Sequence, residues 1–180
     1  MIRMISTVPA SVGGGGSTKE LYSDTTDANY GLGKGLTFHA DAENNIAIGE
    51  NALNSTTGDA DFNIGIGTNA LTAVTLGDSN IAIGYNSGDA MTANSYNIAI
   101  GTSSLSAANS DENGNVVIGY EAGAAIDHDD ADKNVIIGFS AGTGGAAAMA
   151  NCVAIGDSAM NSTAANAQTA GFTQTRSYSQ

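Results

Sequence analysis

One five-residue phrase recurs seven times and constrains the fold more than any other feature of this chain. It reads Asn-Ile-Ala-Ile-Gly or a close variant, and it spans residues 45–49, 63–67, 80–84, 97–101, 115–119, 134–138 and 152–156. Successive final glycines are 17 to 19 residues apart. A repeat too short to enclose its own core buries its apolar side chains by stacking on its neighbours. The period therefore predicts an all-β solenoid of about seven turns, with one phrase in each turn.

Each phrase has the alternation of a short strand. The second position is Ile or Val and the fourth is Ile in every copy, whereas the residue between them is Ala, Gly, Val or Ile. β-Branched residues two apart are typical of a strand. We expect both branched side chains to face one core. The fourth-position residues are Ile48, Ile66, Ile83, Ile100, Ile118, Ile137 and Ile155.

The glycine that ends each phrase implies a backbone constraint. We expect it either to adopt a positive φ or to let another backbone approach closely. The third residue after it is always Ala or Ser, which indicates a tightly packed position. The glycines are Gly49, Gly67, Gly84, Gly101, Gly119, Gly138 and Gly156.

Two positions after the phrase vary together. Where an aromatic residue follows the glycine, the fourth residue after it is Gly; elsewhere that fourth residue is Leu or Met. Because cores tolerate exchanges that conserve total volume, we predict that each ring folds over its glycine and fills the space that Leu fills in other turns. The pairs are Tyr85 with Gly88, Tyr120 with Gly123, and Phe139 with Gly142.

The first position of the phrase forms a column of asparagines. Stacked identical amides can form a hydrogen-bonded ladder, or each Asn can turn the corner into its strand; both interpretations remain open. In the last copy Cys152 replaces Asn, and we interpret it as a small apolar residue that ends the column. The column comprises Asn45, Asn63, Asn80, Asn97, Asn115 and Asn134.

Charge excludes one class of partner. The 180-residue chain has a net charge of −13, and the repeat region contains a single base, Lys133. Such a surface does not bind nucleic acid through phosphate contacts. One cysteine gives no disulfide framework, and no apolar run is long enough to span a bilayer. The first residues are too polar for a signal peptide, so we expect synthesis and assembly in a cytoplasm.

The chain divides into four predicted parts. Residues 1–16 form an arm and a glycine linker, and residues 17–44 form a cap or adaptor that is not a copy of the repeat. Residues 45–160 form the repeat domain. Residues 161–180 form a polar tail.

Candidate chemical sites are weak. An acidic return contains Asp127, Asp129, Asp130 and Asp132, which could bind Ca²⁺, but it lacks the glycine and spacing of calcium loops, and we favour a solvated return. The histidines, His39 and His128, form no catalytic arrangement with their sequence neighbours. We therefore predict no catalytic residues, no cofactor and no enzyme activity.

An alternative solenoid is the left-handed hexapeptide helix of acyltransferases. Its turn of 18 residues has three six-residue faces. Residues 48–53 fit one such face, but Asn54 and Ala60 occupy the positions where the other faces need Ile or Val. Binding of coenzyme A would support this alternative.

The repeated phrase, with Ala or Ser three residues later, resembles the head repeat of trimeric autotransporter adhesins, the YadA-like head, which is similar to repeats in bacteriophage fibres. The resemblance covers residues 45–160. It implies left-handed parallel β-rolls, two short strands per turn, packed side by side as a homotrimer. It would also explain the small residues Ala52, Ala70 and Ser87, if backbones of neighbouring copies met there.

The resemblance leads to three functional hypotheses. The first is a short homotrimeric fibre or appendage of a phage particle, in which residues 1–44 dock to the virion and the roll projects toward another virion protein or a host receptor. The second is a bacterial cell-surface adhesin module. The third is the acyltransferase-like solenoid.

Overall fold

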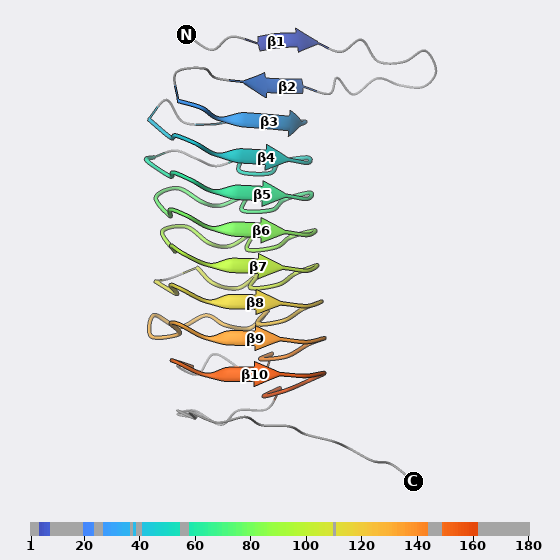
Figure 1. Ribbon diagram of the computed structural model, residues 1–180, viewed down its shortest axis with the longest axis vertical. Helices are drawn as coiled ribbons and strands as arrows, with labels where there is room; N and C mark the ends of the chain where they lie inside the picture. The colour runs from blue at the N-terminus through green and yellow to red at the C-terminus, as the bar shows by residue number, and fades with distance from the viewer. Residues whose placement is uncertain are drawn as a thin grey trace, which may run out of the picture.

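A computed structural model describes residues 4–7, 20–23, 27–36, 38, 41–54, 58–109, 111–143 and 149–161. These residues form an all-β structure without a helix, in which ten strands make one sheet in chain order (Figure 1). The strands are β1 (Met4–Thr7), β2 (Glu20–Ser23), β3 (Tyr30–Gly33), β4 (Ile46–Ile48), β5 (Ile64–Ile66), β6 (Ile81–Ile83), β7 (Ile98–Ile100), β8 (Val116–Ile118), β9 (Val135–Ile137) and β10 (Val153–Ile155).

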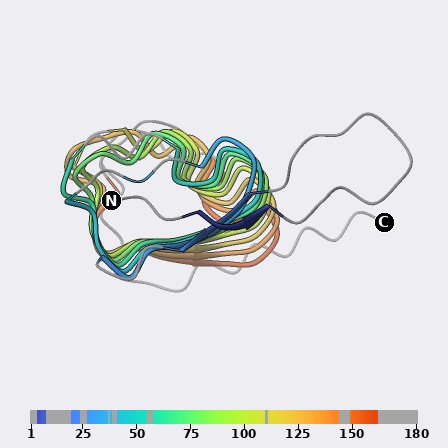
Figure 2. The ribbon, with the colours of Figure 1, turned by 90° about the horizontal axis from the view of Figure 1, so that it is seen from above.

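Strands β3 to β10 are parallel and stack without any shift of register. Ile46 pairs with Ile64, Ile64 with Ile81, and Ile81 with Ile98. Seen along the stack, successive turns lie over one another (Figure 2). The predicted β-solenoid is therefore confirmed, and each of the seven phrases forms one strand.

An eighth phrase precedes the seven that the sequence revealed. Residues 29–33 form β3 and its preceding Asn, and β3 pairs in parallel with β4, Tyr30 opposite Ile46. Asn29 is buried, and its Oδ1 accepts the backbone N–H of Asn45 at 2.8 Å. The prediction that residues 17–44 contain no copy of the repeat was wrong, because Tyr30 and Leu32 replace the branched residues that identify the other copies. Antiparallel β1 and β2 extend the sheet beyond it.

The strands present to the core the face opposite to the one we expected. The middle residue of each phrase, such as Ala47, Ala99 or Ile136, is fully buried, whereas Ile46 and Ile48 are 37% and 41% exposed. The expectation that both branched side chains face the core of the turn was wrong. A coil closed by so few residues has a narrow interior, and the opposite wall already places a residue such as Leu53 there.

Each turn contains one strand in the described residues, not the two that the resemblance implies or the three faces of a hexapeptide helix. After the glycine the chain still bonds to the next turn, for example from Leu53 N to Ala70 O at 3.0 Å. However, the second and fourth residues after each glycine have positive φ, as in Asn51 and Leu53. Extended strands do not contain left-handed residues, so this segment is a hydrogen-bonded turn.

The small residues three positions after each glycine belong to the protomer's own core. Ala52, Ala70 and Ser87 are fully buried inside the coil. Ser87 Oγ lies 2.8 Å from Ala99 O and 2.9 Å from Ser104 Oγ. The close packing predicted for this position is confirmed, but no neighbouring copy is needed to explain it.

Candidate functional site

The asparagine column fixes the register of the strands. Each Oδ1 accepts the backbone N–H of the next column residue, as Asn45 does from Asn63 at 2.8 Å and Asn134 from Cys152 at 2.9 Å. Each Nδ2 donates to a carbonyl of the return segment that follows, as Asn63 does to Gly77 at 2.8 Å. The expected bond between side-chain amides is present at three steps, where the Nδ2 atoms of Asn80, Asn97 and Asn134 donate to the Oδ1 of the preceding Asn at 3.0, 3.3 and 2.9 Å. The residue with positive φ at the corner is the one before each Asn, not the Asn itself.

A second ladder lies two residues before each Asn. The backbone N–H of Asp61 donates to Asp78 Oδ1 at 2.9 Å, and Asp78 N donates to Ser95 Oγ at 3.0 Å. Ser95 N and Asn113 N continue the series to Asn113 Oδ1 and Asp132 Oδ1, both at 2.7 Å. Asp132, which we had considered as a calcium ligand, is therefore an acceptor of the backbone in this ladder.

The glycines that end the phrases form a third column, in which backbones touch. Gly49 has φ of 134°, and a Cβ on it would lie 2.6 Å from the carbonyl oxygen of Gly67. No side chain fits such a gap. Both reasons expected for this glycine are therefore present, and the strand ends of successive turns lie in direct backbone contact.

These columns position a continuous apolar surface that we call the strand face. It consists of the second- and fourth-position side chains of β3 to β10, all of which point away from the core and none of which is charged. The fourth-position column runs from Leu32, 46% exposed, to Ile155, 43% exposed. The strand face is therefore a regular ridged surface of Ile, Val, Leu and Tyr on a protein that is otherwise strongly acidic.

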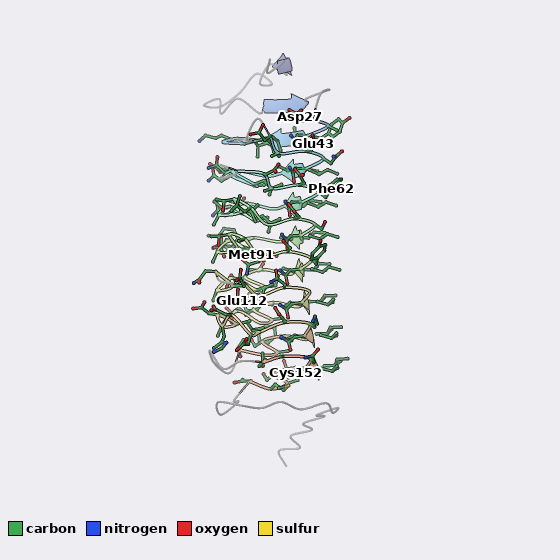
Figure 3. The ribbon with its side chains drawn as sticks, turned by 90° about the vertical axis from the view of Figure 1, so that its left-hand side faces the viewer. Asp27, Glu43, Phe62, Met91, Glu112 and Cys152 are labelled. Carbon is green, nitrogen blue, oxygen red and sulfur yellow. The ribbon has the colours of Figure 1, made fainter. Side chains whose placement is uncertain are left out.

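Two further columns flank the strand face. The start column contains the residue before each Asn: Ala28, Asn44, Phe62, Ser79, Tyr96, Gly114, Lys133 and Asn151. The end column contains the residue after each phrase glycine: Lys34, Glu50, Thr68, Tyr85, Thr102, Tyr120, Phe139 and Asp157. Phe62 projects outward from the strand side of the stack, whereas Met91 and Glu112 lie in the segments away from it (Figure 3).

The aromatic residues of the end column do not fill the core. Tyr85 and Phe139 are 54% and 56% exposed, and Tyr120 stacks on Phe139 with ring centroids 5.0 Å apart. The prediction that each ring covers the glycine four residues after the phrase was wrong. The hydroxyl of Tyr120 contacts Glu121, whose hydrogen bond and negative charge raise the pKa of the phenol.

Other residues fill the space above these glycines. A Cβ on Gly88 would collide with Met91 Cε, and one on Gly123 would lie 3.0 Å from Ile126 Cδ1 and 3.1 Å from a Val117 methyl. On Gly142 it would lie 3.0 Å from Ile136 Cδ1. The side chains beside these glycines are therefore not the rings but the strand middle, at Val117 and Ile136, and the seventh residue after the phrase glycine, at Met91 and Ile126.

The acidic groups lie mostly in the return segments between phrases, away from the strand face. Asp127, Asp129 and Asp130 are exposed, and the described residues contain no cluster of three or more acidic, His or Cys side chains that could hold a metal ion. His128 contacts Asp130 at 4.0 Å, whereas His39 lies outside the described residues. Burial raises the pKa of the Asp89 carboxyl, partly offset by a backbone hydrogen bond.

Comparisons of the chain with protein-family models, with curated protein sequences and with solved structures gave no significant match. Among the described residues there is also no helix with the length and hydropathy needed to cross a membrane. The strand face and its flanking columns are therefore interpreted from their own geometry and chemistry.

Sequence reasoning missed three parts of this site: the eighth phrase, the second ladder and the direction of the strand face. Signals for the first two were present, since an Asn precedes Tyr30 by one residue and Asp, Ser or Asn recurs two residues before the phrase Asn. The signal for the third was the residue between the two branched positions. It is large only at Val117 and Ile136, in two of the turns whose later core position is Gly.

Proposed function

We propose that this protein is the shaft of a short homotrimeric fibre of a bacteriophage particle. Residues 45–160 form the projecting solenoid, and the N-terminal segment attaches it to other virion proteins. The observation that carries the proposal is the strand face, which offers a straight apolar surface along the whole described stack. Exposed apolar patches of more than a few hundred Å² mark interaction sites.

The size of the strand face supports self-association. From β3 to β10 it is about 34 Å tall at ~4.8 Å per strand, and a five-residue phrase is about 17 Å wide. Association would remove from water a column of branched side chains, each worth roughly 1.5–3 kcal/mol when fully buried. A thin solenoid whose largest side chains lie outside its core needs such a contribution.

The width of the face is compatible with three copies. Three faces about one axis form a triangular prism, and a triangle of side about 17 Å has its centre about 5 Å from each side. That distance is half the separation of ~10 Å between packed sheets. The outward Ile and Val side chains would therefore fill the prism at normal packing distance.

Charge supports the same arrangement. The strand face carries no charge, whereas exposed acids such as Asp59, Asp111 and Asp129 lie in the return segments. Like charges brought together oppose association. A side-by-side assembly on the strand face keeps the acidic surfaces outward and solvated.

The mass of the purified chain tests the assembly. Light scattering should give three times 17.9 kDa. Ile83→Asp, in the middle of the strand face, should give monomers, whereas the matched charge Ala93→Asp, on the exposed return segment, should leave the trimer intact. A monomeric native protein, or equal effects of the two variants, would contradict the proposal.

The place of assembly needs a separate experiment. An antibody against the chain should label purified phage particles, and deletion of residues 1–16, most of which lie outside the described residues, should give a trimer that is missing from them. Recovery in a cell-envelope fraction would instead assign the protein to the cell-surface adhesins. Binding of coenzyme A to the purified trimer would revive the acyltransferase alternative, although a turn with one strand does not favour it.

A further inference from the structure

The start and end columns, which border the strand face, complement each other level by level. We call each strand with its two flanking residues a level. At β5 the flanks are Phe62 and Thr68, and at β6 they are Ser79 and Tyr85. The next three levels pair Tyr96 with Thr102, Gly114 with Tyr120, and Lys133 with Phe139. Five consecutive levels thus each carry one ring, which lies on either flank but never on both.

Contact within one chain does not explain this exclusion. The two flanks of a level are six residues apart, with the extended phrase between them. At ~3.3 Å per residue they are about 20 Å apart, beyond the reach of any two side chains. A ring on one flank can therefore exclude a ring on the other only through a second molecule.

The rings of the start column are also costly where they stand. Phe62 and Tyr96 have φ of 58° and 63°, and their side chains are 57% and 68% exposed. A left-handed conformation costs a bulky residue about 1–2 kcal/mol. Other levels place Asn44, Gly114 or Asn151 there, types that accept this conformation easily. Both side chains remain more than half exposed in the single chain, so burial there offsets only part of the cost.

We propose that the two flanking columns form the seam between neighbouring copies in the trimer, with one ring at each level packed against the small residue or lysine of the adjacent copy. This inference rests on the proposed side-by-side trimer. Rotation about an axis parallel to the stack preserves height, so the end of one copy's strand meets the start of the next copy's strand at the same level. The second copy of this chain is thus the partner of all five rings.

The seam also gives the assembly its register. If one copy slips by one level so that its β7 lies beside β6 of the other two, Tyr85 meets Tyr96 at one of its seams and Ser79 meets Thr102 at the other. Rings would then clash at one seam of that copy and leave a gap at the other. At β9, Phe139 would face Lys133, the only base of the repeat region, and a lysine over a ring is attractive. From β4 to β10 the strand face contains only Ile and Val, which distinguish neighbouring levels weakly, whereas the seam residues differ from level to level.

Disulfide trapping tests the seam directly. In a Cys152→Ala background, Ser79→Cys with Tyr85→Cys should form covalent trimers on mild oxidation, because a disulfide requires Cα atoms within about 7 Å. The matched control, Ser79→Cys with Tyr120→Cys, also removes one tyrosine but is offset by two levels, about 9.6 Å. It should remain monomeric on a denaturing gel, as should each single cysteine variant.

An exchange of ring and small residue provides the second test. Ser79→Tyr places two rings at one level and should raise the concentration at which the trimer dissociates at least tenfold. Adding Tyr85→Ser restores one ring per level and should return that concentration to within threefold of the native value. If the cysteine pair at β6 prevents folding, Tyr96→Cys with Thr102→Cys makes the same test at β7.

The outcomes separate this inference from the proposed function. A native trimer by mass that cross-links only in the offset pair, or in which the exchange fails to restore stability, would overturn the seam and leave the trimer standing. The same holds if the rings of the native trimer instead bind a glycan or another virion protein and no same-level cross-link forms. A native monomer would overturn both.

Discussion

The turns that begin at β7 and β8 fill the same narrow core in two different ways. In the first, the strand middle is Ala99 and the later wall contributes Leu105; in the second, the strand middle is Val117 and the later position is Gly123. Leu105 has φ of 50° and Gly123 of 59°, so the backbone is left-handed in both. Leucine bears a strain there of about 1–2 kcal/mol that glycine avoids. The large side chain in the core therefore comes from the segment after the phrase in the turn of β7, and from the strand in the turn of β8.

The turn of β6 provides a third solution. Its strand middle is Ala82 and its later position is Gly88, and Met91 reaches into the space from the return segment. Methionine suits an irregular gap because it has no branching and several torsions. Substitution of the strand middle alone, or of the fourth residue after the phrase glycine alone, should therefore have different effects in these turns.

We expect the largest effect from Ile136→Ala, at the strand middle of β9. Its partner position is Gly142, so no side chain can relax into the cavity, and the loss of stability should be about 3 kcal/mol or more. Denaturant unfolding at a fixed protein concentration measures it. Ile136→Val, which removes a single methylene, should cost about 1 kcal/mol. Equal, small losses of stability for both variants would mean that the strand middle of β9 does not fill the core as we describe.

The core residues of the β7 turn can be replaced by those of the β8 turn to test whether the two arrangements are interchangeable. Leu105→Gly should cost about 2–3 kcal/mol, because the cavity outweighs the relief of backbone strain. Ala99→Val together with Leu105→Gly introduces the β8 pair of Val117 and Gly123, although not Ile126, and should recover at least about 1 kcal/mol as a coupling energy. Strictly additive effects in the double-mutant cycle would refute the exchange.

We expect a smaller effect when Gly123, in the turn of β8, is replaced by alanine. Gly123→Ala brings a Cβ to 3.0 Å from Ile126 and should cost about 2 kcal/mol in strain and overpacking. Gly114→Ala is the control, because Gly114 also has positive φ but its Cβ would lie 3.5 Å from Lys133 Cγ, an ordinary contact. It should cost about 1 kcal/mol. Identical losses would assign the whole effect to φ.

We expect the smallest effect at Asp89, which follows Gly88 in the turn of β6. Burial raises the pKa of its carboxyl, so protonation favours the folded state. The stabilisation is present below the unfolded pKa of about 3.9 and is lost as pH rises through the folded pKa. Asp89→Asn should therefore stabilise the protein slightly at pH 7, by well under about 1 kcal/mol because solvent screens a partly exposed carboxyl, and by nothing at pH 3. Thermal melts at both pH values check this prediction. A gain in stability at pH 3 but not at pH 7 would contradict it.

Local regularity was predictable because it depends on nearest neighbours in the stack. The phrase pattern predicted a strand at each phrase, and small residues after each glycine predicted close packing, as seen at Ala52 and Ala70. The side-chain amide ladder was one of two interpretations; it is seen where Asn80 Nδ2 donates to Asn63 Oδ1 at 3.0 Å, whereas the bond repeated along the column runs from a backbone N–H to the preceding Asn Oδ1, as from Asn63 to Asn45. Each of these features needs only the adjacent turn.

The eighth phrase escaped detection for a different reason. Tyr30 and Leu32 occupy the branched positions, so composition hid a copy that backbone pairing reveals. Likewise, a ring three residues before a glycine suggested that the two are in contact. In the structure the Tyr85 side chain is exposed, whereas the Cα of Gly88 faces the core. Proximity in sequence gave no information about side-chain direction where the chain adopts left-handed residues.

The sequence by itself determined the solenoid, its period, its register and its acidic charge, because a repeat that cannot form a core alone must stack. Only the tertiary structure decided which side of each strand is the inside. An alternation with period two defines two faces but does not assign them, and the larger apolar face is usually the buried one. Here the coil is too narrow to contain two branched columns, so Ala47 lies inside and Ile46 and Ile48 lie outside.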